Sequence, residues 1–318
     1  MRFFHDDSIW NRPIGPSPAV DPSSDRLIRL LGDALPTNRR GFWINTDYWT
    51  IPVYEVDAHT PLRPVYQRPR RPGEKYQPPD AFRHGPGFGP LVPIPDSAQP
   101  AREADQHLAI VDRERQLAWD MWAARKREDG EWESFTGMVY PINGPGTFDA
   151  ADFPIRDGDS LHSYGPSRHA GVPAIAGLVM YDEILSGWID HKLSFATCVN
   201  AYKRFVWPAI WSDGSSDDGI PEGATIQLDP GLDLARFNLS PAARTIARAL
   251  QEYGMINVDS GGGAAVYVEG LWGQRDRSWD GLLADTDLLA IPIDRYRVLE
   301  LGPVTHKGFD TRKRRFAK

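Results

Sequence analysis

The sequence predicts a mainly β protein, and three observations support this prediction. Short apolar or alternating segments recur from residue 105 onward at fairly even spacing, which is typical of an all-β fold. The 318 residues include 28 prolines and 29 glycines, which favour turns and extended connections over a helical bundle. Only a few segments carry helix signals. We therefore expect a single β-sandwich or jelly-roll-like domain with two or three peripheral helices and a long proline-rich arm.

The expected strands begin with two short ones in residues 42–57, which share an aromatic face. In residues 106–122 the sequence QHLAIVDRERQLAWDMW predicts two strands around a turn at DRER. In the first of these, His107 shares one face with Ala109 and Val111, because successive side chains of a strand alternate. Further strands are expected in residues 131–142, 189–197, 202–210, 224–230, 255–260 and 264–270.

Helix signals are clearest in two places. In residues 20–36 Ser23 or Ser24 can cap a helix whose apolar stripe includes Leu27 and Leu31. In residues 239–254 Ser240 caps the helix, Pro241 takes the first helical position and Gly254 ends it. Weaker signals predict one helical turn near residues 181–186 and a short helix in residues 278–292.

The chain divides into four parts by composition. They are residues 1–60, which belong to the main domain, the arm 61–104, the β-sandwich core 105–303 with its inserted helix 240–253, and the basic tail 304–318. The arm has a proline every few residues and a basic bias. Proline lacks the backbone N–H that a central strand needs, so we expect extended chain that contacts a neighbouring subunit. The alternative is a surface loop packed on its own domain.

Charge and composition limit the partners. The net charge of −7 predicts no nucleic-acid partner. Because Cys198 is the single cysteine, neither an intramolecular disulfide nor a cysteine metal cluster is possible. No apolar run reaches ~18 residues, so we expect no membrane insertion. The start of the sequence lacks a signal-peptide pattern, and we expect synthesis in a host cytoplasm.

Two histidines stand among apolar neighbours in predicted strands. In residues 189–195 the alternation places His191 on the inward face, while Lys192 and Ser194 face outward. His107 and His191 could meet on one sheet surface and act there as general bases or sugar ligands. The alternative is that each is a core histidine bonded to a backbone carbonyl.

Other candidate sugar-binding residues lie on loops and strand ends. The loop 159–173 carries His162, Arg168 and His169, and the guanidinium of Arg168 suits a carboxylate or phosphate. Asn143 and Arg204 could bond sugar hydroxyls, and Trp207 could stack on a sugar ring. The full candidate set for glycan binding is His107, Asn143, His162, Arg168, His169, His191, Arg204 and Trp207.

We expect neither a metal nor a cofactor. His162 and His169 do not have a known zinc spacing. The segment 212–223 begins like a calcium loop, but Asp218 stands where that loop requires glycine, which favours an acidic hairpin loop. Glycines 261–263 precede a strand rather than a helix and therefore indicate a tight turn rather than a phosphate loop.

Several stretches occur together in an order that resembles a known group of proteins. They are DSIWNRPIG, QHLAIVD, HAGVPAIAGLVMYDEILSGWIDHKLSF, FVWPA, LSPAARTIARALQEYGMINVDSGG and RDRSWDGLLADTDLLAIPIDRYRVLE. Together they are similar to a poorly characterised family of secreted actinobacterial proteins, often linked to carbohydrate-binding modules, and to related minor tail proteins of actinobacteriophages. The resemblance implies that His107 and His191 match the family's histidines and that Asn143 is a further match. Where relatives have a basic residue and a histidine, this sequence has Ile210 and Trp211.

The resemblance and the basic arm together predict a structural and recognition protein of a phage tail tip. It would be part of the virion, contact other tail subunits through the arm 61–104 and the basic tail, and face the glycan of the bacterial envelope. The alternative is a polysaccharide-degrading enzyme. A lyase would use a histidine base and a cation such as Arg168. A glycoside hydrolase would use two carboxylates, for which the candidates are Asp105, Asp182, Glu183 and Asp190. A third possibility is a purely structural tail component.

Overall fold

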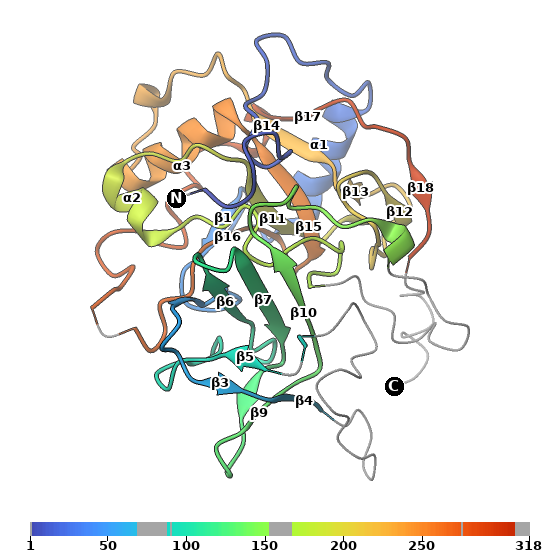
Figure 1. Cartoon of the computed structure of the whole chain (residues 1–318). Helices are drawn as coiled ribbons and strands as arrows, with labels where there is room; N and C mark the ends of the chain where they lie inside the picture. Colours follow the sequence, from blue (N-terminus) through green and yellow to red (C-terminus); the bar gives the residue numbers. More distant parts are fainter. Residues whose placement is uncertain (1, 69–87, 90, 153–166, 275, 309–318) are drawn as a thin grey trace.

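The protein is mainly β, as the sequence predicts. The computed structural model describes residues 2–68, 88, 89, 91–152, 167–274 and 276–308. In these residues most of the regular structure consists of short strands in several sheets, accompanied by three α-helices (Figure 1). No helix among them is long and apolar enough to cross a membrane.

The larger of the two main sheets has six strands and mixed direction. Its order is β1 (Trp43–Asn45), β16 (Ala264–Tyr267), β11 (Leu193–Thr197), β15 (Met255–Ser260), β14 (Thr225–Leu228) and β17 (Tyr296–Val298). β11 runs parallel to β15, and β1 runs parallel to β16, while the other pairs are antiparallel.

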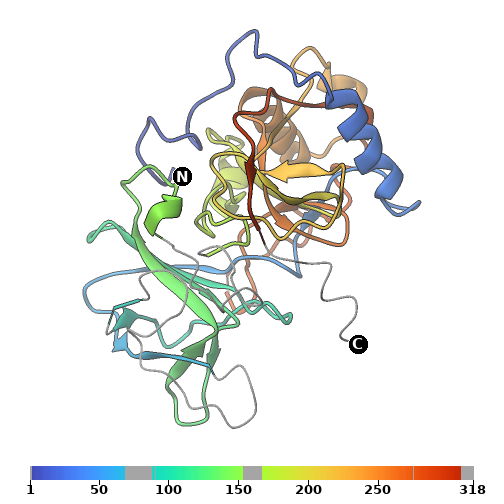
Figure 2. The same cartoon turned by 90° about the vertical axis from the view of Figure 1, so that its right-hand side faces the viewer.

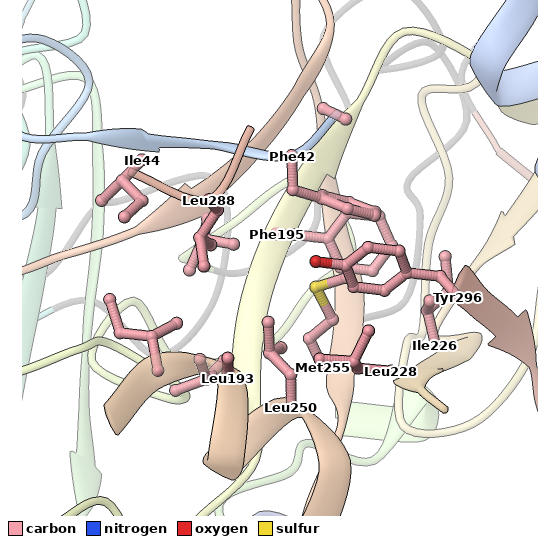
Figure 3. Close-up of a cluster of buried hydrophobic side chains, with 14 of the residues drawn as sticks. Phe42, Ile44, Leu193, Phe195, Ile226, Leu228, Leu250, Met255, Leu288 and Tyr296 are labelled. Carbon is pink, nitrogen blue, oxygen red and sulfur yellow. The ribbon is translucent and has the colours of Figure 1, made fainter. Parts of the chain in front are cut away.

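Helices α1 (Ser24–Ala34) and α3 (Pro241–Glu252) pack against this sheet, and the short helix α2 (Tyr181–Ser186) contacts α3. The apolar stripe of α1, which includes Leu27 and Leu31, enters one core with side chains of β11, β14 and β15. Figure 3 shows this core, in which Phe42 packs edge-on against Phe195 at a ring distance of 5.5 Å. The amphipathic helices therefore bury one face of the sheet.

The second main sheet has four strands in the order β10 (Thr136–Pro141), β7 (Leu117–Trp122), β6 (Leu108–Asp112) and β2 (Val53–Val56). The predicted alternation of β6 is confirmed. Ala109 and Val111 lie in a core that also contains Ile256 and Val258 of the larger sheet, whereas Leu108 and Ile110 lie in a separate core on the other face. Figure 2 shows that this sheet lies to one side of the six-stranded sheet and its helices.

Three small sheets complete the strands. They are β3 (Leu62–Arg63) with β5 (Val92–Pro93), then β4 (Val65–Gln67) with β9 (Trp132–Ser134) and β8 (Arg125–Lys126), and β13 (Ile220–Glu222) with β12 (Asn200–Phe205) and β18 (Thr305–His306). The described flanks of the proline-rich arm therefore pack on the chain's own sheets. Residues 69–87 and 90 of the arm and residues 309–318 of the basic tail lie outside the described residues, so their predicted contacts with other subunits stay predictions.

The two main helix predictions are confirmed, and one minor prediction is wrong. The hydroxyl of Ser240 accepts a hydrogen bond from the backbone N–H of Ala243 at 3.1 Å and caps α3. In contrast, Ser23 precedes α1 without a capping side-chain bond. Residues 278–292 form turns instead of a helix, because Gly281 takes a left-handed conformation with φ +72° that interrupts any helix there.

Candidate functional site

A cleft with a volume of about 760 Å³ lies where the two main sheets meet. One wall comes from the four-stranded sheet and the residues just before it, and includes His107, Trp122 and Thr136. The opposite wall comes from strands β15 and β16 of the six-stranded sheet, which lie next to β6 and β7 in Figure 1. The other lining residues are Pro36, Asn38, Arg39, Trp43, Asn45, Tyr48, Trp49, Asp105, Ser167, Arg168, His169, Ala196, Asp259, Ser260, Gly261, Gly262, Ala265, Tyr267 and Asp285.

A β-bulge brings Asp259 to the cleft. The pairing of β11 with β15 shifts between Phe195, which is opposite Asn257, and Ala196, which is opposite Asp259. Val258 is therefore an extra residue, and the residues after it change faces. In a regular strand Asp259 would lie on the face of Asn257. With the bulge it lies beside Ala196, which lines the cleft.

His107 is buried, and it is uncharged at neutral pH. Burial lowers the pKa of its imidazole to about 4; the nearby carboxylate of Asp105 opposes this shift, and the guanidinium of Arg168 adds to it. No side chain in the described part of the chain hydrogen-bonds to the ring. A neutral imidazole that faces a cleft has a free lone pair and can accept a proton from a ligand.

Arg168 is one of the largest fully buried side chains of the described residues, with 1% of its surface exposed, and it carries a charge. Its Nη2 donates a hydrogen bond to the carbonyl oxygen of Ala174 at 2.8 Å. Nε and Nη1 have no hydrogen-bond partner in the described structure. The guanidinium carbon lies 4.0 Å from the centre of the Tyr267 ring, in cation–π geometry. The cleft therefore contains a buried cation with unsatisfied donors.

His169 is positively charged, whereas His107 is neutral. Its Nδ1 lies 2.9 Å from Oδ1 of Asp259 and 3.1 Å from Oδ2 of Asp213. Burial alone would lower the pKa of His169, but these two carboxylates raise it well above its usual value. His169 also lowers the pKa of Asp259, against the effect of burial. The group is therefore an imidazolium paired with two carboxylates.

The same three side chains offer ligand atoms within 4.8 Å of one another. One imidazole nitrogen and two carboxylate oxygens form a set that a small divalent cation accepts. The hydrogen bonds just described satisfy these atoms in the absence of a metal. The sequence predicts no metal, and it predicts an acidic hairpin loop around Asp213. The hairpin is wrong, because β13 pairs with β12 in parallel and the loop folds back so that the N–H of Asp213 donates to the buried Glu222 at 3.0 Å.

Aromatic side chains surround the opening of the cleft. Trp49 is 54% exposed and Tyr48 is 48% exposed, and their rings lie 6.0 Å apart. Trp43 and Trp122 also line the cleft, and the indole of Trp43 donates to Oδ1 of Asn45 at 3.1 Å. Trp43, Tyr48 and Trp49 come from the segment 42–57, whose aromatic face the sequence predicts. Trp122 comes from a separate predicted strand, and the sequence does not indicate that it lies with them.

The structure brings together three of the eight predicted glycan-binding residues: His107, Arg168 and His169 line the cleft. Four others do not line it, namely Asn143, His191, Arg204 and Trp207. His162 lies outside the described residues. Of the four carboxylates considered for hydrolysis, Asp105 lines the cleft, whereas Asp182, Glu183 and Asp190 do not.

His191 belongs to the core near the N-terminal segment. Its Nδ1 donates to the carbonyl oxygen of Lys192 at 2.8 Å, and its Nε2 donates to the carboxylate of the buried Glu183 at 2.9 Å. Burial alone would lower the pKa of His191, but Glu183 raises it. Both ring nitrogens donate, so the ring is an imidazolium. His107 and His191 therefore do not share a pocket.

The prediction that Lys192 and Ser194 face solvent is wrong. Both are buried, because the N-terminal segment covers Lys192 and the chain around Gly177 covers Ser194. The backbone N–H of Lys192 donates to the carbonyl oxygen of Trp10 at 2.7 Å, and the N–H of Ser194 donates to that of Gly177 at 2.8 Å. Local alternation cannot show that a distant segment covers the polar face.

Comparisons with models of protein families, with characterised proteins and with solved structures found no match to this chain.

Proposed function

We propose that the protein is a glycan-cleaving enzyme in which His107 acts as the general base. The observation that carries this proposal is a neutral imidazole, with a pKa of about 4, at the wall of a cleft of about 760 Å³. A general base must be unprotonated at the working pH and within reach of a bound ligand. Among His107, His169 and His191 of the described structure, His107 alone meets both conditions.

The aromatic rim supports a carbohydrate ligand. Sugar rings have apolar C–H faces that stack on exposed aromatic planes, and their hydroxyl groups need polar partners. Trp49 and Tyr48 provide such planes, and Asn45, Thr136 and Ser260 provide hydrogen-bonding groups in the same cleft. A mostly aromatic rim with a few polar groups inside is the general form of a small-molecule site.

The experiment uses purified protein and a panel of polysaccharides that includes actinobacterial cell-wall arabinogalactan and uronate-rich polymers. We expect the chains to shorten, as measured by size-exclusion chromatography. His107→Gln keeps the size and polarity of the side chain but removes the base, and we expect it to lower the rate about 10²- to 10⁴-fold. His59→Gln is the matched control, because His59 is exposed and lies outside the cleft. Equal rates for the wild type and His107→Gln would refute the role of His107.

A second proposal concerns the place of action. The order of the stretches that resemble phage minor tail proteins, together with the basic arm and tail in the sequence, supports a component of a phage tail tip that meets envelope glycan. Cryo-electron microscopy of particles, beside size-exclusion of the isolated chain, tests this proposal. A free monomer that is absent from particles would contradict it. Such a result would leave the proposed role of His107 in glycan cleavage untouched.

The finer form of the fold is also a proposal. The two main sheets have a common core, in which Val111 and Ala118 of the smaller sheet cluster with Ile256 and Val258 of the larger one. This shared core supports a sandwich-like arrangement, which would make the cleft a feature of the edge where the two layers meet.

A further inference from the structure

Within the described part of the chain, the fully buried guanidinium of Arg168 forms no ion pair with a carboxylate. Nη2 is bonded to a backbone carbonyl, whereas Nε and Nη1 have no partner in the described structure. Buried polar groups are almost always hydrogen-bonded, and a buried charge is normally paired. Two unpaired donors on one buried cation that lines a cleft therefore indicate that a ligand completes the site.

Asp120 and Asp259, which interact electrostatically with Arg168, already have other hydrogen-bond partners. Asp120 accepts hydrogen bonds from the hydroxyl of Tyr140 at 2.8 Å and from the backbone N–H of Ala174 at 2.6 Å, and also from Ser167. Asp259 is bound to His169 at 2.9 Å. These acids lower the cost of burying the guanidinium by their charge, but they leave its Nε and Nη1 donors free. An anion entering the cleft could bind both the charge and the donors.

We infer that Arg168 binds the carboxylate of an acidic sugar, and that the cleft breaks the glycan by elimination at that sugar. The planar fork of arginine matches the two oxygens of a carboxylate. His107, the proposed base, interacts electrostatically with Arg168 in the same cleft. A carboxylate neutralised by a cation makes the hydrogen on the adjacent carbon acidic enough for an imidazole to remove. This inference rests on the proposed function and names its substrate class and reaction.

The step balances without water or a redox partner. His107 takes the proton from the carbon that bears the carboxylate, and that electron pair forms a double bond to the next ring carbon. The glycosidic C–O bond at that next carbon breaks as the double bond forms. The departing oxygen takes a proton from the hydroxyl of Tyr267, whose ring lies under the guanidinium of Arg168. The proton on His107 then returns to Tyr267 through solvent, and the products are an unsaturated uronate end and an alcohol.

Tyr267 carries the proton that the departing oxygen needs, although its raised pKa makes it a weaker acid than an ordinary tyrosine. Burial raises the pKa of its hydroxyl well above the usual value, the charge of Asp259 adds to this effect, and Arg168 opposes it. The phenol is therefore protonated at neutral pH. Hydrolysis would instead need a carboxylic acid as the donor. The carboxyl of Asp259 is unsuited to that role, because His169 lowers its pKa.

The binding test uses two matched ligands, methyl glucuronide and methyl glucoside, with inorganic phosphate as a third probe. We expect the wild type to bind the glucuronide at least about tenfold more tightly than the glucoside by calorimetry. Arg168→Met should remove this preference, and Arg168→Lys should retain part of it. If Arg168→Met fails to fold, the ratio of the wild type's affinities for the glucuronide and the glucoside decides. Equal binding of the two sugars, or stronger binding of phosphate than of the glucuronide, would overturn the inference.

The reaction test separates this inference from the proposed function. Cleavage of a uronate polymer in heavy-oxygen water should give a product with ultraviolet absorbance from its new double bond and without heavy oxygen at the new end. Cleavage that incorporates heavy oxygen would show hydrolysis, which would refute elimination but support the proposal that the protein cleaves glycans. A preference for the glucuronide without cleavage of any polymer would support carboxylate binding by Arg168 and refute the proposal that the protein cleaves glycans.

Discussion

The charge state of His107 makes a quantitative test of the site possible. The imidazole is expected to titrate with a pKa of about 4 in the folded protein, against 6.5 for an unperturbed histidine. The difference of roughly 2.5 pKa units corresponds to about 3 kcal/mol. Between pH 6.5 and 4 the unfolded chain binds the proton and the folded chain does not. His107 therefore contributes fully to stability above pH 6.5, and this contribution is lost as the pH falls toward 4.

The perturbation is His107→Gln, which removes the titrating group and keeps a polar side chain of similar length. The free energy of unfolding, measured with denaturant at a series of pH values, should fall about 3 kcal/mol more in the wild type than in the variant between pH 6.5 and 4. A control with His59→Gln should parallel the wild type, because His59 is exposed. Parallel curves for the wild type and His107→Gln would refute the reasoning.

The causes of the shift can be tested separately by NMR titration of the imidazole. Asp105→Asn removes a nearby negative charge and should lower the pKa of His107 further, while Arg168→Met removes a positive charge and should raise it. Arg168→Lys retains the charge and should leave the pKa closer to that of the wild type. A pKa near 6.5 in the wild type would show that the ring is not desolvated.

Three further outcomes are expected. Glu183→Gln should lower the free energy of unfolding by about 3 kcal/mol, and this loss should be largest between about pH 4.5 and 6.5. The pKa of Glu183 is lowered, so Glu183 stabilises the fold above its unfolded pKa, whereas the pKa of His191 is raised, so His191 stabilises the fold below its unfolded pKa. A loss that does not depend on pH in a denaturant series would count against the ion pair. Gly263→Ala would place a β-carbon 1.8 Å from the Trp43 ring, so it should shift the tryptophan fluorescence and destabilise the fold by about 1–3 kcal/mol. An unchanged emission spectrum and an unchanged Tm would contradict this close contact. Trp49→Ala should weaken glycan binding about tenfold in calorimetry without a change in Tm, and unchanged binding would remove Trp49 from the site.

Local patterns predict the elements well because each depends on neighbours in the sequence. The alternation in β6 sends Leu108 and Ala109 into different cores, as expected from the period of a strand. The Ser240-Pro241 pair begins α3 because the cap and the missing N–H of proline both act within one turn. These local rules are sufficient for the mainly β class and for the positions of most strands.

The site itself is less predictable because its members meet through pairings between distant segments. Asp259 reaches the cleft through a bulge that sequence alternation does not reveal. Trp49 lines the same cleft as His107, although the two are far apart in the sequence. Similar apolar neighbours in the sequence predict that His191 lies with His107, which the structure does not show. The partner of His191, Glu183, lies on α2 only eight residues earlier, and the left-handed turn at Gly187 that ends α2 separates the two in the chain.

His107, His169 and His191 show that the charges around an imidazole, rather than loss of water alone, decide whether it can act as a base. Burial alone lowers the pKa of all three. His169 and His191 each have a carboxylate oxygen 2.9 Å from a ring nitrogen, and that pairing more than offsets the loss of water. His107 has no such bond and has Arg168 nearby, so the same burial leaves it neutral. If His107 were a charged ring that stabilised the fold, we would expect a carboxylate to pair with it in the same way. An unpaired imidazole next to an unpaired guanidinium stabilises nothing by itself, and its placement on a cleft wall is best explained by a ligand that engages both.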